Sequence, residues 1–233
     1  MKGTIKCFCF PFAGGSKYSY SKFIQLAQPE LEIVPIELPG HGSLVKEKLL
    51  TNIDSIVEFL FEKISGQITS NYIFYGHSMG SLVAYLLARR LIDEGYPKPM
   101  HLYVSGCSGP SMLKREIKRY TLPKETFLMR VKELGGIPED IDEELLNFFE
   151  PIIRADFQAI ETYQHEERKP IDVPITVSIG KNENVTLELA QTWDKETIND
   201  VKVFEYPGNH FFIFENAEDI IAEMKRSPNK KRS

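Results

Sequence analysis

A G-x-S-x-G motif is the clearest sign of chemistry in this chain. It reads GHSMG over residues 76–80 and lies between the apolar run NYIFY and the helical run SLVAYLLARRL. In such a strand–turn–helix setting the serine projects from a sharp turn, and the flanking glycines avoid side-chain clashes. The free N–H groups at the start of the helix favour an oxyanion. Ser78 is therefore predicted to be a nucleophile.

Two backbone N–H groups are expected to hold that oxyanion. The residue after the serine, Met79, supplies one of them. The other should come from the loop FAGG (12–15), which follows the first predicted strand and has glycines that let a substrate approach the main chain. Phe12 and Ala13 are both candidates, and the sequence does not choose between them.

A nucleophilic serine needs a histidine as its base, and the chain contains five. His210 lies in the loop YPGNHFF after the last predicted strand, where the histidine comes last in chain order. His41 lies in a Pro-Gly turn and is interpreted as structural, and His77 as orienting the turn around the serine. His101 and His165 are interpreted as surface or boundary residues. The sequence favours His210 as the base.

The acid that orients the histidine should lie between the serine and the histidine, just beyond the end of a strand. The run ITVSIGKNENVT (175–186) places Glu183 there, although a surface turn residue is the alternative. A glutamate can fix the histidine tautomer and stabilise the imidazolium as an aspartate does. Asp172 precedes its strand, while Asp156 and Asp194 lie within helical runs. Glu183 is therefore the predicted acid.

Strand-like runs alternate with helical ones along most of the chain, which predicts an α/β fold with a mainly parallel, doubly wound sheet. The predicted strands are 4–10, 32–38, 71–75, 101–105, 175–179 and 201–205, and the predicted helices outside the insertion are 53–64, 82–91 and 217–225.

Residues 108–168 interrupt this alternation, with helical patterns at 124–134, 142–149 and 151–165. We interpret this part as a helical lid inserted into one domain (1–233), and 226–233 as a disordered basic tail. Apolar lid residues could line an acyl-chain groove or simply pack the lid onto the body. The candidates for the groove are Phe127, Leu128, Val131 and Phe149.

Composition narrows the possible functions. The net charge is −5, which argues against nucleic acid as a partner because phosphates need a basic surface. The three cysteines suggest free thiols in a reducing compartment, with Cys7 and Cys9 as small buried residues of one strand and no metal site. No apolar run reaches the roughly 18 residues of a membrane span, and we expect no signal peptide before the first strand. We expect a cytoplasmic protein that does not bind membranes.

With these residues in place, the chain resembles the type II thioesterases that accompany nonribosomal peptide and polyketide synthases. The resemblance runs nearly from end to end, with one departure: the family usually has aspartate where this chain has Glu183. The residues that carry it are FCFPFAGGS (8–16), ELPGHG (37–42), GHSMG (76–80), VSG (104–106), LGGIP (134–138) and RADF (154–157).

The resemblance implies an α/β-hydrolase fold and a substrate class. Such enzymes remove wrong or stalled acyl groups from the phosphopantetheine thiol of carrier proteins, so the expected partner is a carrier protein and no cofactor or metal is required. We expect a monomer. The alternatives are a small-molecule carboxylesterase or acyl-CoA thioesterase, and a hydrolase-fold binding protein without catalysis.

Overall fold

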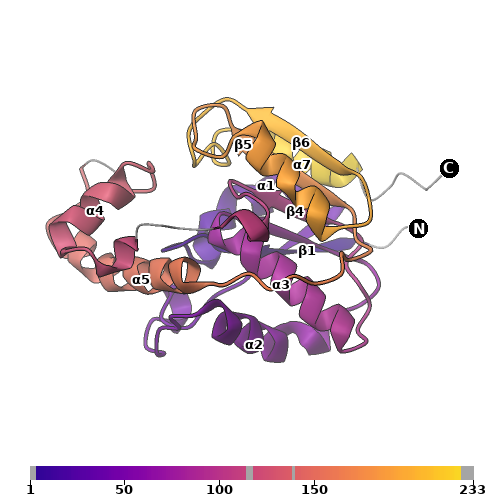
Figure 1. Cartoon of the computed structure of the whole chain (residues 1–233), viewed down its shortest axis with the longest axis horizontal. Coiled ribbons are helices and arrows are strands. Elements are labelled where there is room, and N and C mark those ends of the chain that lie inside the picture. Colours follow the sequence, from indigo (N-terminus) through magenta and orange to yellow (C-terminus); the bar gives the residue numbers. More distant parts are fainter. Residues whose placement is uncertain (1–3, 114–117, 138–139, 227–233) are drawn as a thin grey trace.

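The computed structural model describes residues 4–113, 118–137 and 140–226. Its centre is a six-stranded sheet in which every neighbouring pair is parallel, in the order β2-β1-β3-β4-β5-β6. The predicted α/β fold with a parallel, doubly wound sheet is thus confirmed (Figure 1). The strands are β1 (Ile5–Phe10), β2 (Leu31–Pro35), β3 (Tyr72–His77), β4 (Leu102–Ser105), β5 (Ile175–Gly180) and β6 (Val201–Tyr206).

The inner strands are largely apolar because both faces of the sheet are covered. Every residue of β3 and β5 is buried. Along β1, Cys7 and Cys9 join the core on one face, while Phe8 and Phe10 join the core on the other. The two cysteines are fully buried with their sulfurs 3.7 Å apart, which confirms that they face the same side.

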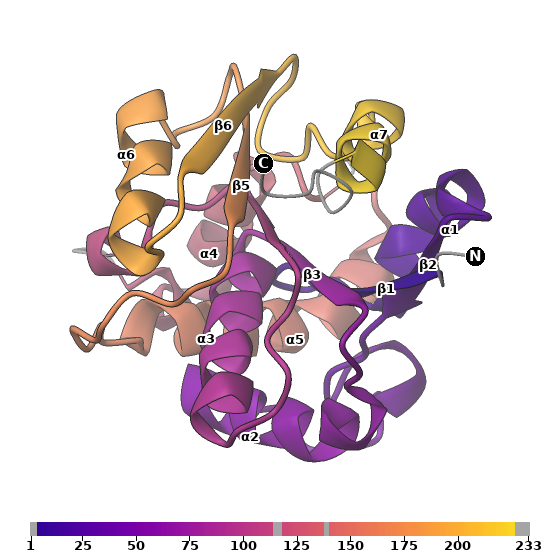
Figure 2. The same cartoon turned by 90° about the vertical axis from the view of Figure 1, so that its right-hand side faces the viewer.

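Helices cover both faces of the sheet. Figure 2 shows α1 (Ser21–Ala27) and α7 (Ala217–Arg226) on one side, and α2 (Ile53–Ile64), α3 (Met79–Asp93) and α6 (Leu187–Gln191) on the other. Asn52 caps α2 by accepting a hydrogen bond from Ser55 N at 2.8 Å. Short 3-10 turns lie at Lys17–Tyr20, Gly42–Leu44, Ser65–Gln67, Pro110–Met112, Arg119–Thr121 and Thr192–Glu196.

The part predicted as a lid contains α4 (Lys124–Lys132) and α5 (Glu143–Thr162), which extend away from the sheet (Figure 1). The prediction of separate helices at 142–149 and 151–165 is wrong, because α5 runs continuously through Pro151. A proline inside a helix removes one backbone hydrogen bond, and its ring crowds the carbonyl four residues earlier, so other contacts must offset both effects. The apolar face continues across it, with Phe149 before it and Ile153 after it packed on one cluster.

Two further boundaries differ from the sequence expectations. The second strand ends at Pro35 instead of residue 38, and its last backbone contact with β1 is the hydrogen bond from Ile36 N to the Cys9 carbonyl at 2.9 Å. The basic tail was predicted to begin at 226, but Arg226 is the last residue of α7, and 227–233 lie outside the described residues. Among the helices that the structure describes, none combines the length and apolar character needed to cross a bilayer.

The register brings the carboxyl ends of the strands to one edge of the sheet. Phe10 pairs with Gly76, His77 with Ser105, and Gly180 with Tyr206. The loops after β1, β3, β4, β5 and β6 therefore all begin at this edge, where ligands bind in open α/β sheets.

Candidate active site

Ser78 lies on a strained turn between β3 and α3. Its φ of 54° and ψ of −115° are disfavoured for a residue with a Cβ, at a cost of about 1–3 kcal/mol. Its N–H donates to the Ser105 carbonyl at 2.8 Å, which ties the turn to the end of β4. A Cβ on Gly76 would lie 2.0 Å from the Gly80 oxygen, and one on Gly80 would lie 2.2 Å from the Phe10 oxygen. Both glycines are therefore needed to bring strand, turn and helix this close together.

His210 is hydrogen-bonded to Glu183. The distance from His210 Nδ1 to Glu183 Oε2 is 2.8 Å, and Glu183 Oε1 accepts from Gly180 N at 2.7 Å. The Glu183 side chain is 1% exposed and that of His210 is 15% exposed. An ionised carboxylate only accepts, so Nδ1 donates, and Nε2 of the neutral ring is left as a proton acceptor.

Backbone contacts between two loops hold this pair together. Asn182 N donates to the Gly208 carbonyl at 3.0 Å, and Lys181 N donates to the Tyr206 carbonyl at 2.9 Å. A Cβ on Gly180 would lie 2.5 Å from the Asn209 oxygen. The loops after β5 and β6 thus run side by side, which explains how residues 27 positions apart meet.

The residues predicted from the sequence gather around one cavity of about 280 Å³. Its lining contains Ser78, Met79, His210, Glu183 and Ala13. A second cavity of about 70 Å³ also has Ser78, Ala13 and His210 in its lining, together with Phe12. The hydroxyl, the imidazole, the carboxylate and both candidate donor loops therefore lie around the same space.

The lid residues divide into two groups. Of the four sequence candidates, Val131 lines the smaller cavity, while Phe127 and Leu128 are buried in the lid cluster and Phe149 packs against it. Lid residues beyond these four also line the cavities, from α5 and the turn after α4. They include Leu134, Ile153, Phe157 and Ile160. The spacing of 153, 157 and 160 on one helix face was the available signal.

His77 lies fully buried beside His210, with ring centroids 4.9 Å apart. Its Nδ1 is 2.9 Å from the hydroxyl oxygen of Ser105. Burial, followed by the nearby His210, lowers the pKa of His77 well below its ordinary value. A neutral His77 adds no positive charge against an imidazolium at 210. Gly106 permits this packing, because a Cβ there would lie 2.5 Å from His77 Cε1.

His41 and Asp156 form a buried pair that the sequence analysis missed. The sequence pattern predicts a structural turn residue at His41, and the place of Asp156 within a helix argues against it as the triad acid. His41 Nε2 lies 2.9 Å from Asp156 Oδ2, and the same oxygen accepts from Gly14 N at 2.7 Å. The exposed fractions of the two side chains are 3% and 1%. Nothing in the local sequence pattern joins residues 115 positions apart.

The other two histidines lie away from the cavity. His101 does occupy the boundary of β4, but it is buried and not at the surface, because its ring stacks on Tyr103 and its Nε2 is 2.9 Å from Thr176 Oγ1. Burial lowers the pKa of His101 to about 4. His165 Nε2 lies 4.0 Å from Glu196 Oε1.

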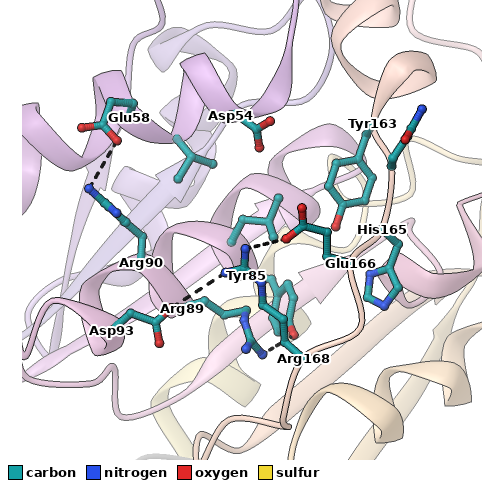
Figure 3. A pocket seen from close by; sticks show the side chains of 13 residues that line it. Asp54, Glu58, Tyr85, Arg89, Arg90, Asp93, Tyr163, His165, Glu166 and Arg168 are labelled. Carbon is teal, nitrogen blue, oxygen red and sulfur yellow. Dashed lines mark hydrogen bonds and ion pairs between the residues drawn. The ribbon is translucent and has the colours of Figure 1, made fainter.

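A larger cleft of about 360 Å³ lies between α2, α3 and residues 163–168, apart from Ser78 (Figure 3). Its arginines are engaged within the protein. Arg90 pairs with Glu58, and Arg168 pairs with Glu166 at 2.7 Å. Arg89 donates to the Tyr85 hydroxyl at 2.9 Å. The residues predicted to carry the chemistry line the cavity of about 280 Å³ instead.

Three features together define the α/β-hydrolase class. These are the parallel sheet, the serine between a strand and a helix, and the histidine–carboxylate pair in the loops after β5 and β6. Within this class the chain belongs to the thioesterase domain family, whose model matches residues 6–227.

Relatives agree with this assignment. The gramicidin S biosynthesis protein GrsT of Aneurinibacillus migulanus is 35% identical over 223 residues, covering 94% of this chain and 87% of GrsT. The crystal structure of ClbQ from the colibactin NRPS/PKS pathway superposes with a TM-score of 0.91 at 27% identity, covering 96% of each chain. RedJ, a thioesterase from the prodiginine biosynthetic pathway in Streptomyces coelicolor, gives a TM-score of 0.90 at 28% identity, covering 95% of this chain and 84% of RedJ. The predicted resemblance to type II thioesterases of these pathways is confirmed.

Proposed function

We propose that this protein hydrolyses acyl thioesters carried on the phosphopantetheine arm of carrier proteins, using Ser78, His210 and Glu183 as a catalytic triad. One observation carries the proposal: in a chain of the thioesterase family, Ser78 lines the same cavity as a hydrogen-bonded His210–Glu183 pair. Removal of stalled or wrong acyl groups from a synthase is the role that this activity would serve.

The proposed reaction has two halves. His210 Nε2 takes the Ser78 proton as the hydroxyl attacks the thioester carbonyl, and Glu183 stabilises the imidazolium that results. The tetrahedral oxyanion collapses and breaks the C–S bond, and the phosphopantetheine sulfur leaves as a thiol with the proton that the His210 imidazolium returns. Water activated by the same imidazole then hydrolyses the acyl-serine. The glutamate performs the role that aspartate usually has in this family.

The cavity linings favour Ala13 over Phe12 as the second oxyanion donor. Ala13 lines both cavities that contain Ser78, whereas Phe12 lines only the smaller one. The next N–H along the loop, that of Gly14, is already engaged by Asp156. The proposed oxyanion hole is therefore made of the Met79 and Ala13 N–H groups, and the loss of one donor typically costs about 3 kcal/mol in the transition state.

The apolar lining supports an acyl substrate. Leu82, Leu113, Phe157 and Ile160 lie around the same cavity as Ser78. The phosphopantetheine thiol arrives with the carrier protein, so the proposal includes a synthase carrier protein as partner and no separate cofactor. A monomeric protein in the cytoplasm would meet such carriers directly.

Two measurements test this function. A fluorophosphonate probe should label Ser78, as located by mass spectrometry, and Ser78→Ala should abolish both labelling and turnover. Folded protein that leaves Ser78 unlabelled would favour a binding protein without catalysis.

The second measurement compares the rates at which one acyl group is hydrolysed from a carrier protein, from coenzyme A and from a simple ester. The rate should be highest with the carrier protein. A strong preference for the simple ester would point to a carboxylesterase.

A further inference from the structure

We propose that Asp156 is a positioning residue that reaches from the lid helix α5 to the loop after β1 and fixes the direction of the Ala13 N–H. Catalysis would then depend on the lid being docked on the body. This inference rests on the proposed function, because it concerns the donor assigned there to the oxyanion.

Two side chains of α5 contact Gly14. Asp156 Oδ2 accepts from Gly14 N at 2.7 Å, across 142 residues of sequence. Ile153, one turn earlier, packs against Gly14 so closely that a Cβ there would lie 2.6 Å from Ile153 Cγ1. Gly14 has a φ of +76°, which also favours glycine. The lid helix therefore holds this residue both by a hydrogen bond and by contact.

The geometry also indicates a positively charged His41. Its Nε2 is 2.9 Å from Asp156 Oδ2, and its Nδ1 is 2.9 Å from the Pro39 carbonyl oxygen. A carbonyl and an ionised carboxylate both lack a proton to donate, so each ring nitrogen must carry one. A buried imidazolium beside Asp156 balances the charge of a carboxylate that is almost fully buried.

Holding Gly14 constrains the peptide groups beside it. Gly15 N donates to the Phe12 carbonyl at 2.8 Å and closes a tight turn around Ala13 and Gly14. The turn is therefore held by two hydrogen bonds, one from Gly15 N to the Phe12 carbonyl and one from Gly14 N to Asp156. These two bonds fix the direction in which the Ala13 N–H points. If α5 moved away from the body, Gly14 N would lose its acceptor and the donor would be free to rotate.

The test compares three substitutions at position 156. Asp156→Ala removes the acceptor, and Asp156→Leu does the same while filling the volume. Asp156→Asn keeps an amide oxygen for Gly14 N but removes the charge. We expect kcat to fall about 10- to 100-fold for Ala and Leu and about 3- to 10-fold for Asn, with KM within about threefold. Asp142→Ala is the control, because it removes the cap of the same helix without touching Gly14.

A transition-state analogue separates positioning from folding. An acyl trifluoromethyl ketone forms an oxyanion on the serine, so its Ki should rise by the same factor as kcat/KM falls in each variant. Asp142→Ala should lower the Tm but leave that Ki unchanged. If the Asp156→Ala and Asp156→Leu variants do not fold, an increase in Ki of at least threefold in Asp156→Asn would support the proposal.

The proposal would be overturned if a folded Asp156→Ala or Asp156→Leu variant kept the wild-type kcat and the wild-type affinity for the analogue. If only Asp156→Asn folds, the same result in that variant would overturn it. The Ser78→Ala variant distinguishes this outcome from failure of the proposed function. If Ser78→Ala is inactive while position 156 is insensitive, only the positioning role is wrong. If Ser78→Ala is active, the assigned triad itself is wrong.

Discussion

The carboxylate of Glu183 controls which nitrogen of His210 carries the proton, so Glu183→Gln should disrupt catalysis without disturbing the fold. Glu183 uses both oxygens, one toward Gly180 N at 2.7 Å and one toward His210 Nδ1 at 2.8 Å. A glutamine has one oxygen for these two donors. If the oxygen stays on Gly180 N, the amide NH₂ faces Nδ1 and makes it an acceptor. The proton then sits on Nε2, which can no longer accept one from Ser78.

The reversed amide is also unfavourable. Its NH₂ would face Gly180 N, leaving a buried donor without a partner at a cost of about 1–3 kcal/mol. The positive charge that forms on His210 in the transition state would still lack its carboxylate. The corresponding substitution in a serine protease triad lowers kcat about 10⁴-fold. We expect a decrease of about 10³- to 10⁴-fold here, which corresponds to roughly 4–5.5 kcal/mol.

The assay is release of free thiol from a short acyl thioester, followed with a thiol-reactive dye, together with thermal unfolding. Glu183→Gln should keep a Tm within about 4 °C of the wild type, since replacing one hydrogen-bonded side chain by an isostere costs about 1 kcal/mol. Glu188→Gln, an exposed position in α6, is the matched control and should retain full activity. Turnover within threefold of the wild type in Glu183→Gln would refute the reasoning and mean that another group orients His210.

Two further predictions concern the turn and the buried pair. Gly76→Ala should leave little folded protein or lower the Tm by 10 °C or more, because the added Cβ would lie 2.0 Å from a backbone oxygen. In the control Gly66→Ala, the added Cβ meets nothing within 4 Å, so the Tm should change by less than about 2 °C. Equal effects of the two substitutions would contradict this packing argument. Burial opposes protonation of His41, but the hydrogen bond and charge of Asp156, the Pro39 carbonyl and the charge of Glu37 outweigh it, so the pKa of His41 is raised. A raised pKa stabilises the folded state below about pH 6.5, the ordinary histidine value, and that stabilisation is lost as the pH rises through the raised value. The Tm of the wild type should therefore exceed that of His41→Gln most at pH 6 and by less at pH 9, and a gap that widens with pH would contradict the assignment.

The local sequence pattern was sufficient for the parts of this protein that depend on neighbours along the chain. Strands buried on both faces appear as largely apolar, β-branched or aromatic runs, as in β3 and β5. The alternation along β1 separates its cysteines from its phenylalanines. The glycines of GHSMG are required by the turn itself, so Ser78 could be located before any tertiary contact was known. Chain order along a parallel sheet then placed Glu183 and His210 at the same edge, and their hydrogen bond confirms that they meet.

Only the tertiary structure reveals the contacts between distant segments that the local sequence pattern does not predict. The sequence pattern predicts a break between residues 149 and 151, yet α5 runs through Pro151 because packing of its apolar face offsets the lost hydrogen bond and the crowding by the proline ring. His41 and Asp156 each resemble ordinary residues of a turn and a helix, and their partnership exists only because α5 docks against the loop after β1. Long-range pairing depends on how rigid elements pack in three dimensions. Residue type and spacing along the chain therefore determined the serine elbow and the sheet, whereas the docked lid determined which buried charges meet beside the cavity.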